Sequence, residues 1–217
     1  MELIILLILS YLTGSIPTSI IVSRITKNVD IRQHGSGNAG ATNVYRILGW
    51  KYALIVLLLD IFKAWLPTAI YATTIFQYIS ILDIGFMQIL CGSSAVIGHT
   101  YPIFARFKGG KGVGSLIGVL LALFPIAFPL CLIVAIAVIV TTGYVSLGSI
   151  FAAISLPIFI LILPALGIIS PNLSLVVFSL LVPWFVIYTH RSNISRIRNG
   201  TENRFDKALI FNNKKIN

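Results

Sequence analysis

The chain has 217 residues, of which 57% are hydrophobic and only 10% are charged. Soluble domains are about 45–50% apolar and about 25% charged, so this composition excludes an ordinary water-soluble fold and indicates a protein that lies in lipid. The formal net charge of +10 does not indicate a nucleic-acid partner, because no base-reading motif accompanies it.

The apolar residues fall into runs that can cross a bilayer, for which a helix needs about 20 residues. The first three spans are expected at 3–23, 52–72 and 84–98. Gly14 and Pro17 predict a kink in the first span, which membrane helices tolerate. Glu2 stands where a secretory signal carries a basic residue, so the first run is expected to remain as a span.

The 79 residues from Gly112 to His190 contain no Asp, Glu, Lys or Arg. Basic segments adjoin both ends of this stretch, so it is expected to cross the membrane an even number of times. Two crossings would leave much of it unexplained, and four are therefore predicted, the first two of them short. They are expected at 113–127, 128–143, 148–166 and 173–189. The predicted fold is an all-α integral membrane protein with seven transmembrane helices, and five helices are the alternative.

The basic residues predict the orientation of the chain. Of 16 Lys and Arg residues, only Lys63 lies outside three short segments. Short loops rich in Lys and Arg stay in the cytoplasm, so the N-terminus is expected outside and the C-terminus inside. We expect one transmembrane domain over 1–217, with cytoplasmic motif segments at 24–51, 99–112 and 190–217. The polar break that ends at Ser146 is expected to return to the same face.

The first motif, at 34–43, places three glycines among Ser, Thr and Asn side chains. The glycines match the dinucleotide pattern G-x-G-x-x-G, but no strand precedes them, and Asp60, at the expected spacing, lies in an apolar run. Backbone N–H groups and polar donors can instead cradle a phosphate, and Arg46 lies nearby. The alternative is a flexible loop or a packing contact through small residues.

The second motif, at 98–112, has the glycines and lysines of a P-loop. It lacks the hydroxyl residue of a Walker A motif, because Gly112 follows Lys111. Lys108 and Lys111 at a helix start can still hold phosphate oxygens. The alternative is that they set the topology and meet lipid headgroups, and His99 alone would be read as an interfacial histidine.

The third motif, at 190–202, follows the last apolar run. His190, Asn193 and Ile197 have helical spacing, so they are predicted on one face of a helix at the membrane surface, with Arg196 close by. Histidine can donate to an anion or move a proton near neutral pH. The alternative is a basic helix that only anchors the chain.

Together the three motifs resemble those of the bacterial integral-membrane acyl-phosphate:glycerol-3-phosphate acyltransferase family. The matching stretches are SGNAGATN at 36–43, GHTYPIFARFKGGKG at 98–112 and HRSNISRIRNGTE at 190–202; Ile197 stands where the family usually has Leu. The resemblance implies transfer of a fatty acyl group from acyl phosphate to the 1-hydroxyl of glycerol 3-phosphate. The products would be lysophosphatidate and inorganic phosphate, in the first committed step of phospholipid synthesis at the cytoplasmic face of a bacterial plasma membrane.

The resemblance also assigns roles to polar residues. Glycerol 3-phosphate would be recognised by Ser36, Arg46, Lys108, His190 and Asn193. The long-chain acyl phosphate would be held by Thr42, Asn43, Lys111 and Ser146. Further binding candidates are Gly37, Asn38, Gly40, His99 and Gly110. The catalytic candidates are His190, Asn193 and Ser36. The base is either His190 or the substrate phosphate, whose second pKa is about 6, and the phosphate is favoured.

No cofactor and no metal are expected, because the six acidic residues are dispersed. No covalent nucleophile is expected either, because acyl phosphate is already activated and no Ser-His-Asp set is visible. No histidine has an aspartate five residues later, as in acyltransferases with a His-x-x-x-x-Asp pair. The alternative function is a small transporter or channel for an organic phosphate. Asp60 and Lys63, inside the second span, favour it, although the two can instead pair with each other. A structural protein without chemistry would leave the three motifs unexplained.

Overall fold

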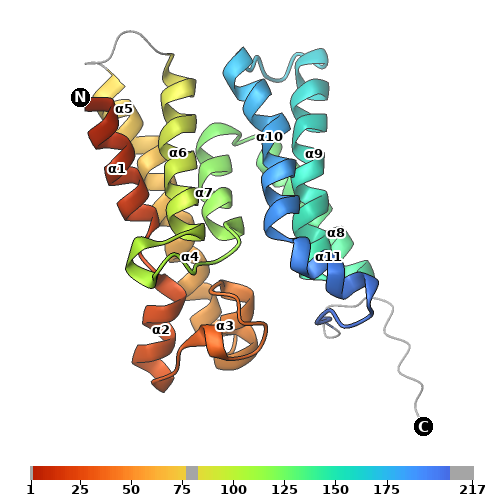
Figure 1. Cartoon of the computed structure of the whole chain (residues 1–217). Coiled ribbons are helices and arrows are strands. Elements are labelled where there is room, and N and C mark those ends of the chain that lie inside the picture. Colours follow the sequence, from red (N-terminus) through yellow and green to blue (C-terminus); the bar gives the residue numbers. More distant parts are fainter. Residues whose placement is uncertain (1, 77–82, 206–217) are drawn as a thin grey trace. The chain divides into compact units, whose positions relative to one another are not determined.

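The computed structural model describes residues 2–76 and 83–205, and every regular element in these ranges is helical. This confirms the all-α prediction. The chain forms two compact units, Met1–Pro125 and Ile126–Asn217, whose helices are labelled in Figure 1. One transmembrane domain over the whole chain stays a prediction.

The first unit is built on three pairs of packed helices: α1 on α6, α4 on α7, and α3 on α4. Its helices are α1 (Glu2–Gly14), α2 (Thr18–Lys27), α3 (Ala41–Leu48), α4 (Trp50–Leu66), α5 (Ala72–Phe76), α6 (Ile84–Thr100) and α7 (Val113–Leu123). The 3₁₀ turns η1 (Ile31–Gln33) and η3 (Ile103–Ala105) lie in its loops, and the π turn η2 (Pro67–Tyr71) joins α4 to α5.

The predicted interruption of the first span is confirmed, because α1 ends at Gly14 and α2 begins after Pro17. Small residues allow α1 to touch α6 backbone to backbone. A Cβ on Gly14 would lie 2.0 Å from the carbonyl oxygen of Ala95, and one on Gly98 would lie 2.2 Å from that of Tyr11. Such close contacts are typical of helix pairs in membranes, where packing rather than the hydrophobic effect drives association.

The second unit consists of helices packed in sequence, α8 on α9 and α9 on α10. Its helices are α8 (Ala127–Thr142), α9 (Val145–Ala165), α10 (Leu173–Thr189) and α11 (Arg191–Arg198). The predicted apolar runs in this half are therefore confirmed as helices. The axis bends by 58° between α10 and α11, at His190.

Three helical stretches in the described ranges are long and apolar enough to cross a membrane, and α10 with α11 makes a fourth if the bent pair counts as one. They are Glu2–Lys27, Trp50–Thr74 and Val145–Ala165. By contrast, α7 ends at Leu123 and has 11 residues, which span about 16 Å, about half the hydrocarbon thickness. A multi-pass membrane protein is therefore supported, whereas seven crossings and their orientation stay predictions.

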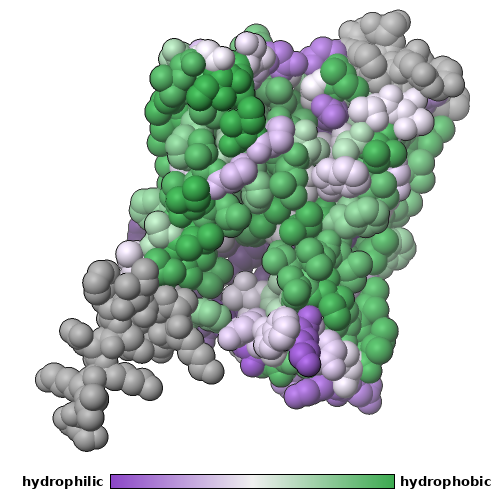
Figure 2. Space-filling view, turned by 180° about the vertical axis from the view of Figure 1, so that it is seen from behind, coloured by the Kyte–Doolittle hydropathy of each residue, from purple (hydrophilic) through white to green (hydrophobic). Residues whose placement is uncertain are grey.

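The surface of the molecule agrees with a lipid environment. Figure 2 shows hydrophobic side chains over most of the visible face, and hydrophilic ones toward the top and the bottom of the view. Many large apolar side chains are exposed, such as Ile4, Leu58 and Trp184 at 64%, 56% and 74%. Apolar exposure on this scale marks a surface that contacts lipid or a partner.

Asp60 and Lys63 form a buried ion pair inside α4. Lys63 Nζ lies 2.9 Å from Asp60 Oδ1 and also donates to the carbonyl oxygen of Ile16 at 2.8 Å. Thr18, at the start of α2, donates to Asp60 Oδ1 at 2.6 Å. His99 Nδ1, in the last turn of α6, lies 3.4 Å from the same oxygen. Both charges therefore have their partners within the protein. This confirms the interpretation that Asp60 and Lys63 pair with each other.

Replacing one member of this pair is expected to destabilise the protein by about 3–5 kcal/mol, because the other charge stays buried without its partner. Asp60→Asn and Lys63→Met should each lower the midpoint of thermal unfolding in detergent. The double variant should lose less stability than the two single variants lose together. Lys51→Met, which removes an exposed lysine from the same helix, is the control. Strictly additive effects would contradict the pairing.

Candidate functional site: three polar motifs on two helical units

The first motif is a loop that the side chain of Asn43 closes. Asn43 lies in the first turn of α3 and is fully buried. Its Oδ1 accepts from the backbone N–H of Ser36 at 2.9 Å. Its Nδ2 donates to the carbonyl oxygens of Ile31 at 3.1 Å and His34 at 2.9 Å. Both amide hydrogens are therefore used inside the protein, and the geometry does not favour the expected direct contact between Asn43 and an acyl phosphate.

Two different constraints favour glycine in this loop, the backbone conformation and the close approach of neighbouring atoms. Gly35 and Gly37 have φ of +59° and +71°, a region that other residues rarely adopt. A Cβ on Gly35 would also lie 2.3 Å from Asn43 Oδ1, so the turn and the Asn43 clasp require each other. Gly40 precedes α3 and has extended backbone, and the neighbour nearest to a Cβ there is the side chain of Asn38 at 2.8 Å.

Polar groups of the first motif remain partly accessible around this closed loop. Ser36, Asn38, Thr42 and Arg46 are all half-buried. Thr42 and Arg46 are four residues apart on α3, so they lie on one face of the helix. This face presents a hydroxyl and a guanidinium, which are donors suited to an anionic oxygen.

The second motif folds back onto the end of the helix that precedes it. The N–H of Gly109 donates to the carbonyl oxygen of Thr100, and that of Gly110 to the carbonyl oxygen of His99, both at 3.2 Å. A Cβ on Gly109 would lie 2.1 Å from the His99 carbonyl oxygen, and one on Gly110 would lie 2.3 Å from His99 Nε2. These glycines are therefore required by the packing of the loop on α6, whether or not they also touch a ligand.

The cations of the second motif lie on either side of these glycines. Lys108 is exposed and Lys111 is half-buried. Gly112, with φ of +82°, then begins α7 without a side-chain cap on the first turn. A helix start that follows two lysines is a favourable place for an anion, because the helix dipole and the cations act in the same direction.

The structure brings the first and second motifs together in the first unit. The carbonyl oxygen of Ala39 would lie 2.8 Å from a Cβ on Gly110, so the two loops touch through backbone. Arg32, just before the first motif, donates from Nη1 to the carbonyl oxygen of Ala105 at 3.0 Å. A cavity of about 10 Å³ between the loops is lined by residues that include Lys63 and His99, and it has room for about one water molecule.

His99 is 6% exposed and lies beneath the second motif. Its Nδ1 is close to Asp60 without hydrogen-bond geometry, and its Nε2 faces Gly110. His99 is thus placed between the buried ion pair and the loop. It is a support for the loop in this arrangement rather than a side chain presented to a ligand.

His190 closes α10 and precedes α11 in the second unit. It is 3% exposed, so it is buried rather than presented at a surface as the spacing predicted. Its Nδ1 lies 2.8 Å from the carbonyl oxygen of Val186. A carbonyl oxygen only accepts, so in this bond Nδ1 carries the hydrogen, and in the neutral ring Nε2 is then the acceptor nitrogen.

The third motif converges on Glu202, a residue that the sequence argument did not select. Glu202 Oε1 accepts from Asn193 Nδ2 at 2.6 Å and from Ser146 Oγ at 3.0 Å. Its Oε2 accepts from Arg196 Nε at 2.7 Å. Ser146, at the start of α9, is thereby brought to α11 although 56 residues separate it from Glu202. Ser146 and the third motif therefore lie together within this unit, whereas the face on which they lie stays a prediction.

Hydrogen bonds hold Glu202 in its charged form. Burial alone raises the pKa of the carboxyl, but the hydrogen bonds from Asn193, Arg196 and Ser146 outweigh it, and the pKa lies below its ordinary value. The segment after Glu202 also returns to the α8–α9 turn, where the N–H of Phe205 donates to the carbonyl oxygen of Gly143 at 2.7 Å. Residues 206–217 of the third segment lie outside the described residues.

In the described ranges no group of three or more His, Cys, Asp or Glu residues could hold a metal ion. The donors of the motifs are hydroxyl, amide, imidazole, ammonium and guanidinium groups. Such groups bind phosphate oxygens and carbonyl groups through hydrogen bonds and charge. The chemistry that they suit is the binding and transfer of groups between anionic substrates.

The comparison with known proteins covers nearly the whole chain. The family model for glycerol-3-phosphate acyltransferase matches residues 4–200. The glycerol-3-phosphate acyltransferase of Chlorobaculum parvum is 42% identical, with 90% of this chain and 93% of the relative covered. A solved structure of PlsY (YgiH), an integral membrane glycerol 3-phosphate acyltransferase in its glycerol 3-phosphate form, is 36% identical, covers 94% of this chain and 96% of its own, and has a TM-score of 0.80. Its lysophosphatidic acid form is 35% identical, covers 94% and 95%, and has a TM-score of 0.78.

The apolar helices define a multi-pass integral membrane protein, and its polar motifs carry donors that suit anionic oxygens. The matches then assign it more narrowly. The chain belongs to the glycerol-3-phosphate acyltransferase family, and it is an acyltransferase of phospholipid synthesis.

Neutralising Glu202 is expected to loosen the third motif. Glu202→Gln removes the charge that three donors share, and hydrogen bonds to a charged group contribute about 1.5–3 kcal/mol. The midpoint of thermal unfolding at neutral pH should therefore fall. Because the folded-state pKa is lowered, the stabilisation is present above the ordinary glutamate pKa and is lost as pH falls through the folded-state pKa.

The difference between the native chain and Glu202→Gln should accordingly shrink when unfolding is measured at successively lower pH. Glu2→Gln, the same chemical change at an exposed residue, is the control and should have little effect. A difference that does not change with pH would show that the Glu202 charge is not what holds Ser146, Asn193 and Arg196 together.

Proposed function

We propose that this protein transfers a fatty acyl group from a long-chain acyl phosphate to the 1-hydroxyl of glycerol 3-phosphate. The products are lysophosphatidate and inorganic phosphate. The observation that carries the proposal is the match to a solved structure described as a glycerol 3-phosphate form, at 36% identity over 94% of this chain. The second solved form is described as a lysophosphatidic acid form, which is the expected product of this reaction.

Donors from all three motifs recognise glycerol 3-phosphate in this proposal. Ser36, Arg46 and Lys108 bind its phosphate and hydroxyl groups, together with His190 and Asn193. The half-buried face of α3 and the exposed Lys108 support this assignment, since they offer hydroxyl, guanidinium and ammonium donors near the meeting point of two loops. Charge-assisted hydrogen bonds of this kind are about twice as strong as neutral ones.

The acyl phosphate end is held by Thr42, Lys111 and Ser146, with Gly37, Asn38, Gly40, His99 and Gly110 forming the surrounding loops. Asn43 contributes by closing the first loop, because its amide is bonded to backbone. In the reaction the 1-hydroxyl oxygen forms a bond to the acyl carbon, and the bond from that carbon to the phosphate oxygen breaks. Arg and Lys side chains stabilise the charge on the departing phosphate.

The proton of the attacking hydroxyl goes to the phosphate of glycerol 3-phosphate. A phosphomonoester has a second pKa of about 6, so the substrate carries its own base, and the protein only has to position it. His190 is the competing base, because its Nε2 is the acceptor nitrogen when the ring is neutral. In this proposal the reaction takes place at the cytoplasmic face of a bacterial plasma membrane. The chain crosses that membrane seven times, and its N-terminus lies outside.

The transport alternative loses the feature that favoured it. Asp60 and Lys63 are 2% and 5% exposed and paired with each other. Charges that line a pathway face a continuous water-filled cavity. These two are enclosed by α2, α4 and α6, and the cavity beside Lys63 has room for only about one water molecule.

The proposal is tested with the purified full chain in lipid nanodiscs and radiolabelled glycerol 3-phosphate. A long-chain acyl phosphate should give labelled lysophosphatidate, and the matching acyl-CoA should not. Product from acyl-CoA alone would contradict the choice of donor. Uptake of label into sealed vesicles without any product would support transport instead.

Replacing His190 separates binding from base catalysis. His190→Asn keeps a donor, so it should raise the KM for glycerol 3-phosphate by the equivalent of about 1–3 kcal/mol and change kcat little. An obligatory base would instead cost about 10²–10⁴-fold in kcat at saturating substrate. Residual turnover should follow a phosphate-like ionisation.

Ser192→Ala, at an exposed position on α11, is the control for this change and should leave both constants unaltered. Normal binding of glycerol 3-phosphate together with the full loss of kcat at every pH would overturn the role of the substrate as base.

A further inference from the structure

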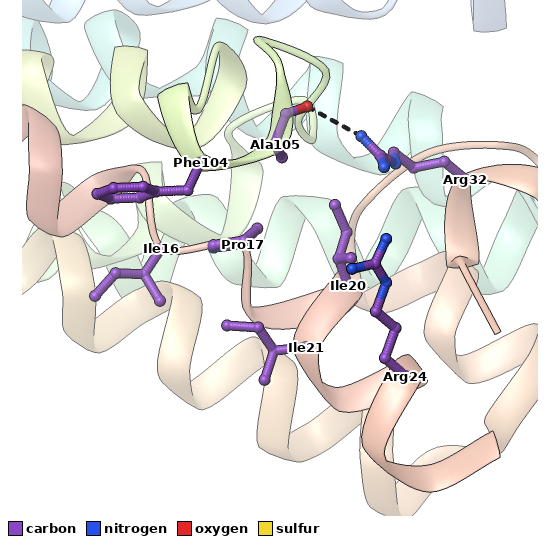
Figure 3. Close-up of a pocket in the computed structure, with 8 residues that line it drawn as sticks. All are labelled: Ile16, Pro17, Ile20, Ile21, Arg24, Arg32, Phe104 and Ala105. Carbon is purple, nitrogen blue, oxygen red and sulfur yellow. Dashed lines mark hydrogen bonds between the residues drawn. The ribbon is translucent and has the colours of Figure 1, made fainter. Parts of the chain in front are cut away.

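An amphipathic pocket lies on the first unit, apart from the residues assigned to the substrates. It has a volume of about 410 Å³ and lies between α2 and the loop that contains η3. Figure 3 shows Phe104 beside Ile16 toward one side of the pocket and the guanidinium groups of Arg24 and Arg32 toward the other. Its volume lies in the range of about 300–1,000 Å³ that is typical of ligand sites.

The apolar side of the pocket is open at the surface. Ile16, Ile21 and Phe104 are 43%, 41% and 63% exposed. Leaving such side chains in water costs about 25 cal/mol for each Å² of apolar area, so this side is suited to a hydrocarbon chain. Ile16 and Ile21 lie on the stretch Glu2–Lys27, one of the candidate spans.

The polar side of the pocket carries one guanidinium that is fixed and one that is loosely held. Arg32 donates to Asp30 from Nε at 3.0 Å and from Nη2 at 2.7 Å, besides its bond to the Ala105 carbonyl. Arg24 Nη2 lies 3.6 Å from Asp30 Oδ2, and its side chain is 63% exposed. An exposed ion pair of this kind contributes little energy, so Arg24 can turn to another anion.

The charges around the pocket do not cancel. The hydrogen bond from the Arg32 side chain lowers the pKa of Asp30 to about 2, so Asp30 is ionised at neutral pH and balances one of the two arginines. The polar side therefore keeps a net positive charge beside an apolar wall, which fits a molecule with an anionic head and a hydrocarbon tail.

We propose that this pocket binds one anionic membrane phospholipid. Its phosphate lies between Arg24 and Arg32, and the start of an acyl chain follows Ile16, Ile21 and Phe104. The bilayer supplies this ligand at the surface that the apolar side already faces. Of the described residues that line the pocket, none is among those assigned to glycerol 3-phosphate or acyl phosphate, which favours a membrane lipid over a reactant.

The test measures retained lipid, so its outcome does not depend on the proposed reaction. The full chain is placed in nanodiscs with equal amounts of phosphatidylglycerol and phosphatidylcholine, released into detergent and examined by native mass spectrometry. The native chain should retain one phosphatidylglycerol in preference to phosphatidylcholine. Arg24→Gln should lower the retained phosphatidylglycerol about fivefold, as expected for one cation at an anionic lipid surface.

Lys27→Gln is the matched control, because it removes the same charge from the same helix outside the pocket lining. It should retain the lipid as the native chain does. Ile21→Ser should also weaken retention, since it removes part of the apolar wall. An unchanged thermal unfolding midpoint shows that each variant is folded.

Three results would overturn the proposal. Equal retention of phosphatidylglycerol and phosphatidylcholine by the native chain would remove the role of charge. Equal retention by Arg24→Gln and the native chain would place the lipid elsewhere. Displacement of phosphatidylglycerol by an equal concentration of lysophosphatidate or acyl phosphate would assign the pocket to the amphiphiles of the reaction.

Discussion

The carboxylate of Asp60 is the point at which the helices of the first unit meet. Thr18 from α2, Lys63 from α4 and His99 from α6 all approach it. A Cβ on Gly114, in the first turn of α7, would lie 3.0 Å from Asp60 Cβ. A charge enclosed in this way needs every one of its partners, because an unpaired ion in an apolar interior is expensive. The start of α7 and the end of α6, between which the second motif lies, are therefore placed by the same buried charge.

The helices could be predicted well because lipid makes hydropathy a direct signal. The apolar runs at 84–98 and 173–189 correspond to α6 and α10 with bounds that differ by two residues or fewer, and the break at Gly14 and Pro17 was visible in the residue types. The number of crossings was not fixed by the same signal. A run that continues past Leu123 is apolar in sequence, yet the helix stops there, before Pro125.

The sequence singles out the polar residues of the candidate site, but it does not give the hydrogen-bond partners of each. Residue types and spacing single out Asn43 and Asn193, but they cannot show that each amide is bonded inside the protein. Glu202 was missed because its partner Ser146 is 56 residues away, and a pairing over that separation leaves no local pattern. The signal that was present is that Glu202 is the one acidic residue of the third motif at 190–202, which carries three arginines, so a partner for its carboxylate could be expected there.

The bend at His190 makes the length of α10 decide where this imidazole points. The helix begins after Asn172, whose side chain accepts from the N–H of Leu175, and it ends at the histidine, with 17 residues between them. Each residue of a helix advances it by about 1.5 Å and turns it by about 100°. One inserted leucine would therefore leave the apolar character of the span almost unaltered while aiming the imidazole at a different neighbour. The exchange of one apolar side chain for another along α10 therefore leaves the direction of His190 unaltered, whereas the gain or loss of a single position changes it.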